Sequence, residues 1–238
     1  MVEKVWHMGG SVNAMGAREA ASALRWWLES GVDVAIQDLP RNWFERDLAP
    51  PAAEPKAPEA LPETLEAFRE WLSTSPEAPL ASARSRAVLP RGVENAEVMV
   101  LCDPPTREEL ASGEPIGGEP GALMKRMLAA IGMADRAYSA NLACFHSPGS
   151  RLSPEQIEHC AAAGRRHVAL VRPKRLLLLG DLTSQALLGK PMLQARGHVH
   201  KVEGIRTIAS FHPRQLLKRP SDKALAWKDL LLLTEESP

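Results

Sequence analysis

A histidine followed by proline stands in the segment of this chain best suited to chemistry. Residues 207–211 are an apolar run typical of a short buried strand, and the run ends at His212 and Pro213. Proline cannot donate to a strand ladder and favours an extended conformation in the residue before it, so this pattern presents the imidazole at a strand end. From these residues alone, a structural histidine between a strand and a helix is an equal alternative.

Two adjacent leucines, Leu216 and Leu217, follow the histidine, and no helical or strand pattern requires them to be buried. Three cations flank them, Arg214, Lys218 and Arg219. Apolar side chains among cations suit a protein that pushes between stacked bases while it holds the neighbouring phosphates. We therefore expect both leucines to be exposed, and all five residues to contact DNA.

This segment resembles the His-Pro-Ser-x-Leu-Leu-Arg motif of the uracil-DNA glycosylase superfamily, in particular its iron–sulfur (family four) branch. Further family motifs follow in the same order over about residues 65–232. The matching residues are Asp103-Pro-Pro, Glu109, Gly113, Pro115, Gly118, Gly121, Tyr138-Ser-Ala-Asn141, Pro148-Gly-Ser-Arg151, Pro154-Glu155, Leu176–Gly180 and Arg196-Gly197. The resemblance implies DNA as the partner and hydrolysis of the N-glycosidic bond of uracil or another deaminated base.

The resemblance also implies roles for single residues. His212 matches the histidine that donates to uracil O2, and Asn141 the asparagine that reads O4 and N3–H. Asp103 stands at a catalytic glutamate of the family and could orient water, although a turn or capping role is a strong alternative. Ile116 replaces the phenylalanine that stacks on the flipped base, which removes a contact worth about 1–3 kcal/mol. His146 stands where the family usually has an arginine.

The family's four-iron cluster needs four cysteines, and this chain has only three. The aligned ligand positions are Ser75, Ala78, Phe145 and Cys160, and Cys144 is displaced from the third position by one residue. We therefore expect neither the cluster nor any other metal. Apolar side chains such as Phe145 would fill the space instead.

Alternating apolar and amphipathic segments predict a three-layer α/β/α sandwich around a four-stranded, mainly parallel sheet. Asp103, Asn141 and His212 each lie at or just past a strand end, so three strands bring polar groups to one edge of the sheet. Helices are expected at about residues 62–73, 119–132, 153–171, 181–189 and 221–234, and strands at about 97–102, 137–143, 175–180 and 206–211.

Composition indicates three segments: a tryptophan-rich appendage at residues 1–48, a Pro/Ala-rich linker at 49–62, and the glycosylase-like domain at 63–238. The appendage contains an expected helix at 17–30 and a brief strand at 32–36. It could pack on the domain or bind a protein partner, and the sequence does not decide between these alternatives.

The chain has 238 residues and a net charge of zero, which argues against a protein that coats DNA non-specifically. Residues 196–228 nevertheless hold eight basic residues against two acidic ones, a local charge of +6. No membrane span, signal peptide or disulfide pattern is evident, so we expect a cytoplasmic monomer.

Two hypotheses of different classes follow. The first is a DNA glycosylase without a cluster, which the intact Asn141 and His212 favour. The second is a degenerate glycosylase-fold protein that binds DNA or a nucleobase with little or no activity. Cys102 and Thr106, which replace loop glycines of the family, and Ile116 favour this alternative.

Overall fold

The computed structural model describes residues 17–31, 61–81, 86–146 and 152–235. The chain divides into two units, residues 1–58 and 59–238. In the first unit the structure describes helix α1 (Ala17–Glu29), with Trp26, Trp27 and Leu28 exposed. The expected strand at 32–36 and nearly all of the 49–62 segment lie outside the described residues.

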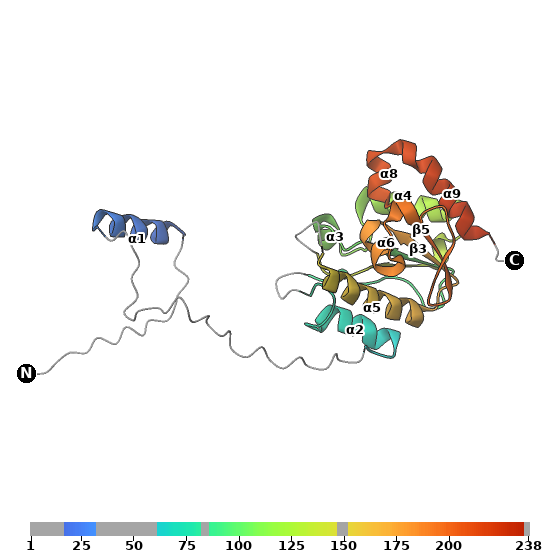
Figure 1. Cartoon of the computed structure of the whole chain (residues 1–238), viewed down its shortest axis with the longest axis horizontal. Helices are drawn as coiled ribbons and strands as arrows, with labels where there is room; N and C mark the ends of the chain where they lie inside the picture. The colour runs from blue at the N-terminus through green and yellow to red at the C-terminus, as the bar shows by residue number, and fades with distance from the viewer. Residues whose placement is uncertain (1–16, 32–60, 82–85, 147–151, 236–238) are drawn as a thin grey trace, which may run out of the picture. The chain divides into compact units, whose positions relative to one another are not determined.

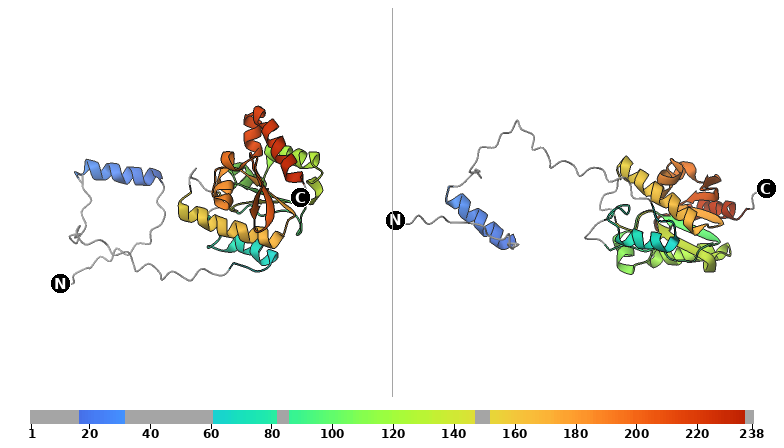
Figure 2. Two further views of the ribbon diagram at one scale, coloured as in Figure 1. Left: turned by 45° about the vertical axis from the view of Figure 1, so that its right-hand side comes forward. Right: turned by 90° about the horizontal axis from the view of Figure 1, so that it is seen from below.

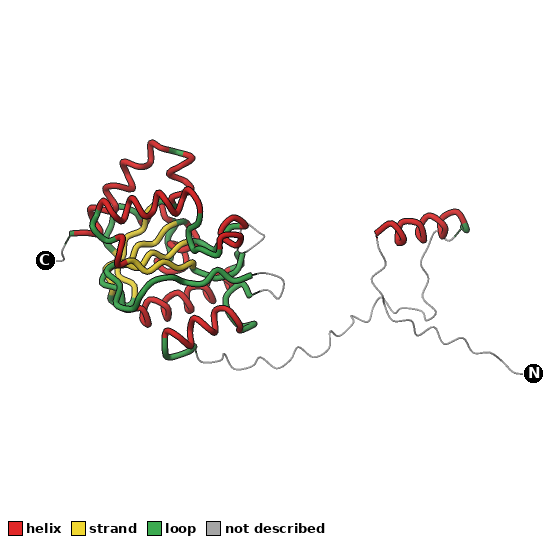
Figure 3. The backbone as a smooth tube through the Cα atoms, turned by 180° about the vertical axis from the view of Figure 1, so that it is seen from behind, coloured by secondary structure: helices red, strands yellow, loops and turns green. Residues whose placement is uncertain are grey.

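The second unit is built on one sheet, whose strands are yellow in Figure 3 and which includes the labelled strands β3 and β5 of Figure 1. The strand order is β2-β1-β3-β5-β4. The four strands expected from the sequence are present and parallel to one another, as predicted. They are β1 (Val98–Cys102), β2 (Ala137–Asn141), β3 (Arg175–Leu179) and β5 (Ile205–Ser210).

The prediction of four strands was one strand short, because β4 (His200–Val202) pairs antiparallel with β5 at the sheet edge. The two strands form a hairpin whose turn residues, Glu203 and Gly204, both have positive φ, at 50° and 78°. Such a turn matches the right-handed twist of the strands. A strand of three residues is too short to show a period, which is why the sequence pattern did not reveal it.

Helices cover both faces of the sheet (Figure 2). The first face packs against α2 (Leu65–Thr74), α5 (Pro154–Val171) and α6 (Asp181–Leu188), and the second against α4 (Gly118–Ala130) and α9 (Lys223–Thr234). The described part of the unit also contains the short α-helices α3 (Arg107–Ser112), α7 (Met192–Ala195) and α8 (Pro213–Lys218), and the 3-10 helices η1 (Ala134–Arg136) and η2 (Pro220–Asp222). Within the described ranges, no helix has the length and apolar character needed to cross a membrane.

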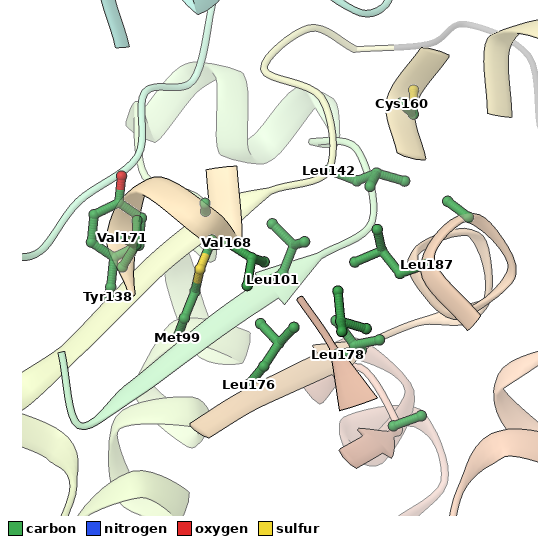
Figure 4. Packing of buried hydrophobic residues seen from close by; sticks show 14 of the residues in the cluster. Met99, Leu101, Tyr138, Leu142, Cys160, Val168, Val171, Leu176, Leu178 and Leu187 are labelled. Carbon is green, nitrogen blue, oxygen red and sulfur yellow. The ribbon is translucent and has the colours of Figure 1, made fainter. Parts of the chain in front are cut away.

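Alternate residues of each strand enter opposite cores, as the two-residue period of a strand requires. Figure 4 shows Met99, Leu101, Leu176 and Leu178 in the core shared with α5 and α6. Their sequence neighbours, such as Val100 and Leu177, enter the core shared with α4 and α9. Both faces of the sheet are therefore covered by helices, so a ligand would bind at the ends of the strands rather than on a face.

The strand register brings the carboxyl ends of the parallel strands level with one another. Cys102 lies opposite both Asn141 and Leu179, and Leu179 lies opposite Ser210. The loops that begin with Asp103, Gly180 and Phe211 consequently leave the sheet at the same end of the strands. In α/β sheets, ligands bind at the carboxyl ends of the strands.

A buried histidine lies under α2. The Tyr138 Oη and His167 Nε2 atoms are 2.8 Å apart, and Arg69 Nε donates to the same hydroxyl at 3.3 Å. Burial, reinforced by the charge of Arg69, lowers the pKa of His167 to about 3. The ring is therefore neutral in the folded protein and shares a hydrogen bond with the tyrosine hydroxyl.

We predict a pH-dependent loss of stability that involves His167. Its folded pKa of about 3 lies below the ordinary value of 6.5, so between these values the unfolded chain binds a proton that the folded chain does not. The free energy of unfolding should fall as the pH falls, by up to about 1.4 kcal/mol per pH unit for this one group. Between pH 6.5 and 4.5, the free energy of unfolding measured with urea should change less steeply with pH in H167Q than in wild type. The exposed His159 provides the control H159Q, and an unchanged slope in H167Q would contradict the assignment.

Candidate active site

Asp103 follows β1, and its carboxylate contacts the amino-terminal end of α6. Its Oδ1 atom accepts from both the backbone N–H and the hydroxyl of Thr183, each at 2.9 Å. Gly180 makes this approach possible, because a Cβ atom there would lie within 2.5 Å of the carboxylate oxygens. Asp103 therefore has the capping role that the sequence left open, and it also faces the hollow described below.

Opposing effects act on the pKa of Asp103, and together they raise it. Burial raises the pKa of its carboxyl, whereas the two hydrogen bonds from Thr183 and the charge of Arg214 oppose the rise. A carboxylate whose pKa is raised binds a proton more readily than an exposed one. It is thus better suited to accept a proton from water than an ordinary surface aspartate would be.

Asn141 is the last residue of β2, and its amide is buried. The Nδ2 group donates to two backbone carbonyls, that of Asp103 at 2.8 Å and that of Pro115 at 3.1 Å. The Oδ1 atom is buried and has no hydrogen-bond partner among the described residues. Since both donors are used, the amide offers a ligand only an acceptor.

His212 caps the amino-terminal end of α8. Its Nδ1 atom accepts from the backbone N–H of Arg214 at 3.2 Å. Burial, with a smaller contribution from the charge of Arg214, lowers the pKa of the ring to about 3. A neutral imidazole that accepts at Nδ1 carries its proton at Nε2, so His212 presents an N–H donor.

A buried ion pair fixes the end of β5 just before this histidine. Asp229 of α9 accepts from the hydroxyl of Ser210 at 2.7 Å and from the Arg196 guanidinium at 3.0 Å. The same guanidinium lies over the Phe211 ring, with its Cζ atom 5.1 Å from the ring centroid. Residues on both sides of the strand end are therefore anchored, which limits the positions open to the imidazole.

The structure brings five of the predicted site residues to one hollow with a volume of about 630 Å³. The hollow is lined by Asp103, Thr106, His212, Arg214, Gln215, Lys218 and Arg219. Asn141 does not line the hollow but donates to the backbone carbonyl of Asp103, which does line it. Ile116 does not join this group, because it packs in the core beside α4 and lines a separate cavity of about 240 Å³.

The prediction that Leu216 is exposed is wrong. Residues 213–218 form α8, begun by the His212 cap and by Pro213 in its first turn, and a helix sends adjacent side chains in different directions. Leu216 is 1% exposed and packs with Met192, Phe211 and Ala226, whereas Leu217 is 36% exposed. Only Leu217 retains the exposure expected of a wedge residue.

A network that was not apparent from the sequence joins α3 to α8. Glu109 is buried, and its Oε2 atom accepts from the Thr106 N–H at 2.8 Å and from Arg214 Nη1 at 3.3 Å. The spacing Thr106-x-x-Glu109 is a capping box, a signal that could have identified the start of α3 but not the pairing with Arg214.

Other positions that the resemblance singled out have structural roles or cannot be described. His146 lies where its Nδ1–H donates to the Pro105 carbonyl at 2.8 Å, which supports the loop after β1. Residues 148–151 lie outside the described residues.

The residues at the positions of the family's cluster do not fit a four-iron cluster. Ala78 and Phe145 belong to an apolar cluster with Phe68, and Cys160 lies in the core on the same side of the sheet. Burial raises the pKa of the Cys160 thiol to about 11 and that of Cys144 to about 12, so both thiols are protonated. Iron–sulfur ligands must be thiolates, and the chain has too few cysteines for the full set.

Comparison of the sequence with known proteins identifies the family. The profile of the uracil DNA glycosylase superfamily matches residues 89–231, more than half of the chain. A type-4 uracil-DNA glycosylase of Archaeoglobus fulgidus is 30% identical over 141 residues, which cover 54% of this chain and 71% of that protein. A type-4 enzyme of Pyrobaculum aerophilum is 22% identical over 71% of this chain and 92% of its own length, and a type-5 enzyme of the same organism is 24% identical over 78% and 88%. The chain belongs to the uracil-DNA glycosylase superfamily.

Proposed function

We propose that this protein hydrolyses the N-glycosidic bond of uracil, or of another deaminated base, in DNA. The observation that carries the proposal is the buried amide of Asn141, whose Oδ1 acceptor has no partner among the described residues. Buried polar atoms without partners are rare in folded proteins and call for an explanation. A base that donates an N–H to this oxygen supplies one.

Deamination creates the donor that such a site would recognise. Cytosine has a bare ring nitrogen at position 3 and adenine has one at position 1, whereas uracil and hypoxanthine have an N–H group at these positions. Against Oδ1, a bare nitrogen places two acceptors face to face, but an N–H forms a hydrogen bond. The acceptor-only amide of Asn141 therefore favours uracil over cytosine and hypoxanthine over adenine.

The proposed reaction breaks the C1′–N1 bond of the flipped nucleotide, and the bonding electrons go to the base. Water adds its oxygen to C1′ and loses a proton, and the products are an abasic sugar and the base, which takes up a proton. In this scheme Asp103 orients the water and accepts its proton, since its raised pKa favours that role. His212 donates from Nε2 to O2 of the base, where negative charge develops.

A neutral histidine suits this role. An imidazolium at this position would be a stronger donor, but burial beside Arg214 disfavours a second positive charge. A neutral donor with a fixed orientation stabilises the anion without reorganisation at the moment of reaction. Its charge state should not change over the physiological pH range.

The exposed cations beside the hollow would hold the DNA. Lys218 and Arg219 line it from the end of α8, and Leu217 lies next to them. We assign the cations to phosphate contacts and Leu217 alone to the wedge that enters the base stack.

The alternative is a glycosylase fold that binds DNA or a nucleobase without cutting it. Two observations favour this alternative: the Asp103 carboxylate already caps α6, and Ile116 packs in the core rather than in the hollow. Both proteins would bind DNA, so only a measurement of base release separates them.

The first experiment measures base release from oligonucleotides that contain uracil, hypoxanthine, xanthine or cytosine, followed by alkaline cleavage at abasic sites. We expect release of at least one deaminated base and none of cytosine. H212N should keep a side-chain cap on α8 but lose the Nε2 donor, and we expect its single-turnover rate to fall by about 10²–10³-fold. The exposed-site variant H159Q serves as the control. Loss of DNA binding in H212N, with an unchanged rate per bound complex, would contradict the catalytic role.

A second prediction concerns the two leucines. L217A should reduce base release from duplex DNA more than from single strands, because a single strand needs less unstacking. L216A should instead destabilise the fold, by about 2–5 kcal/mol, since it removes a buried side chain. Thermal melting and paired duplex and single-strand assays distinguish the two effects. Equal losses of L217A on both substrates would remove the wedge role.

A third prediction concerns the phosphate contacts. The double variant K218Q/R219Q should weaken binding to all DNA sequences alike and reduce the slope of log affinity against log salt by about 2. Fluorescence anisotropy over a series of salt concentrations measures the slope. The exposed Lys174, which pairs with Glu97 at the amino ends of the strands, provides the control K174Q. An unchanged slope in the double variant would exclude these residues from the interface.

A further inference from the structure

Arg214 occupies the position at which the family motif His-Pro-Ser-x-Leu-Leu-Arg has its serine. From the sequence it was expected to contact DNA together with Lys218 and Arg219. Its side chain, however, does not extend into solvent as theirs do. It lies between a buried carboxylate and the proposed catalytic histidine, and only 26% of it is exposed.

The guanidinium of Arg214 lies beside the imidazole of His212. Its Nε atom is 3.3 Å from His212 Nδ1, and its Nη2 atom is 3.3 Å from His212 Nε2. The Nη1 group donates to Glu109 Oε2 at 3.3 Å. Every nitrogen of the guanidinium is therefore near a group of the site.

The contact between Nη2 and Nε2 cannot be a hydrogen bond in the state of the ring that the helix cap sets. Because Nδ1 accepts from the Arg214 backbone N–H, Nε2 carries the proton, and arginine nitrogens are always donors. Two donors thus lie 3.3 Å apart without satisfying each other. A single oxygen atom that faces both groups could accept from each at ordinary hydrogen-bond distance.

We propose that Arg214 is a catalytic residue, and that its Nη2 group and His212 Nε2–H form a two-donor hole for the carbonyl oxygen of the departing base. This inference rests on the proposed function, since it concerns the same bond cleavage. When the C1′–N1 bond breaks, the electrons move onto N1 and O2 of the base. The neutral histidine supplies a directed donor, and the arginine, whose Nη1 is paired with Glu109, adds a charged donor beside the same oxygen.

Glu109 is the positioning residue of this arrangement. Its carboxylate is held by the N–H and hydroxyl of Thr106 and in turn holds Nη1 of Arg214. A guanidinium is planar, so a fixed Nη1 also fixes the direction of Nη2. The same Oε2 atom accepts from Thr106 and from Nη1, so Nη2 stays free of Glu109 and lies beside His212 Nε2.

This assignment gives a physical reason for the unusual residue at position 214. Ile116 cannot stack on the base as an aromatic ring would, and the structure places it away from the hollow. Stabilisation of the departing anion by a second donor lowers the barrier by a route that needs no stacking. Removal of one donor from such a hole typically costs about 10²–10³-fold in rate.

The test compares two leaving groups, uracil and 5-fluorouracil, in otherwise identical oligonucleotides. Fluorine withdraws electrons and stabilises the departing anion by itself, so the second base depends less on donors from the protein. Single-turnover rates at saturating enzyme should fall by about 100-fold for R214Q on uracil and by a distinctly smaller factor on 5-fluorouracil. R214K keeps the charge but not the planar fork, and we expect an intermediate loss on uracil.

K174Q is the control, because the exposed Lys174 pairs with Glu97 at the amino ends of the strands and does not line the hollow. Its single-turnover rates on both bases should equal those of wild type. Melting temperatures identify any variant that fails to fold, and R214K then carries the comparison.

Three results would overturn or redirect the inference. Equal losses of R214Q on both bases would make Arg214 a structural or DNA-binding residue. A loss that vanishes at saturating enzyme would make it a phosphate contact, as the sequence first indicated. If wild-type protein releases neither base, the proposed function itself fails, and this outcome is distinct from a failure of the Arg214 assignment.

Discussion

The hydrogen bond from the backbone N–H of Arg214 to His212 Nδ1 determines most of what this site can do. It caps α8 and thereby sets the direction in which that helix leaves the sheet. It also selects the tautomer of the ring, because a neutral imidazole that accepts at Nδ1 must carry its proton at Nε2. Helix position, side-chain chemistry and charge state therefore depend on the same contact.

Two further sets of contacts hold this histidine in place. On the sheet side, the Asp229 carboxylate binds Ser210 and Arg196, and Arg196 lies over Phe211. From α3, Glu109 binds the Arg214 guanidinium, which lies beside the imidazole. Buried ion pairs contribute little net stability, but loss of one partner is costly, so such pairs restrict a site to a single geometry. The rigid edge of the parallel sheet supports both sets.

Much of the fold could be predicted, because four short, largely apolar strands alternate with longer helical segments. The shared edge of Asp103, Asn141 and His212 followed from the rule that parallel strands end together. The edge strand β4 and the short helices α3 and α8 were missed, since segments of three to six residues carry almost no periodicity. The error on Leu216 has the same origin. Because α8 was not recognised, the direction of the Leu216 side chain could not be predicted.

The details of the site could not be predicted for a different reason. The pairing of Glu109 with Arg214 joins residues far apart in the chain, and no local pattern encodes it. The use of both Asn141 donors by backbone carbonyls depends on the path of two loops. The charge state of His212 depends on burial, which composition does not reveal. Sequence patterns can therefore identify candidate residues, whereas their protonation and free hydrogen-bonding groups require the structure.

The central claim is that His212 is neutral and carries its proton at Nε2. Long-range proton–nitrogen correlation spectra of the histidine rings measure both properties directly, and the spectrum of H212N assigns the signal. We predict that the His212 ring, like that of His167, does not titrate between pH 8 and 4.5, and that the His212 signal keeps the Nε2–H tautomer. Titration near pH 6.5, or a proton at Nδ1, would contradict this claim.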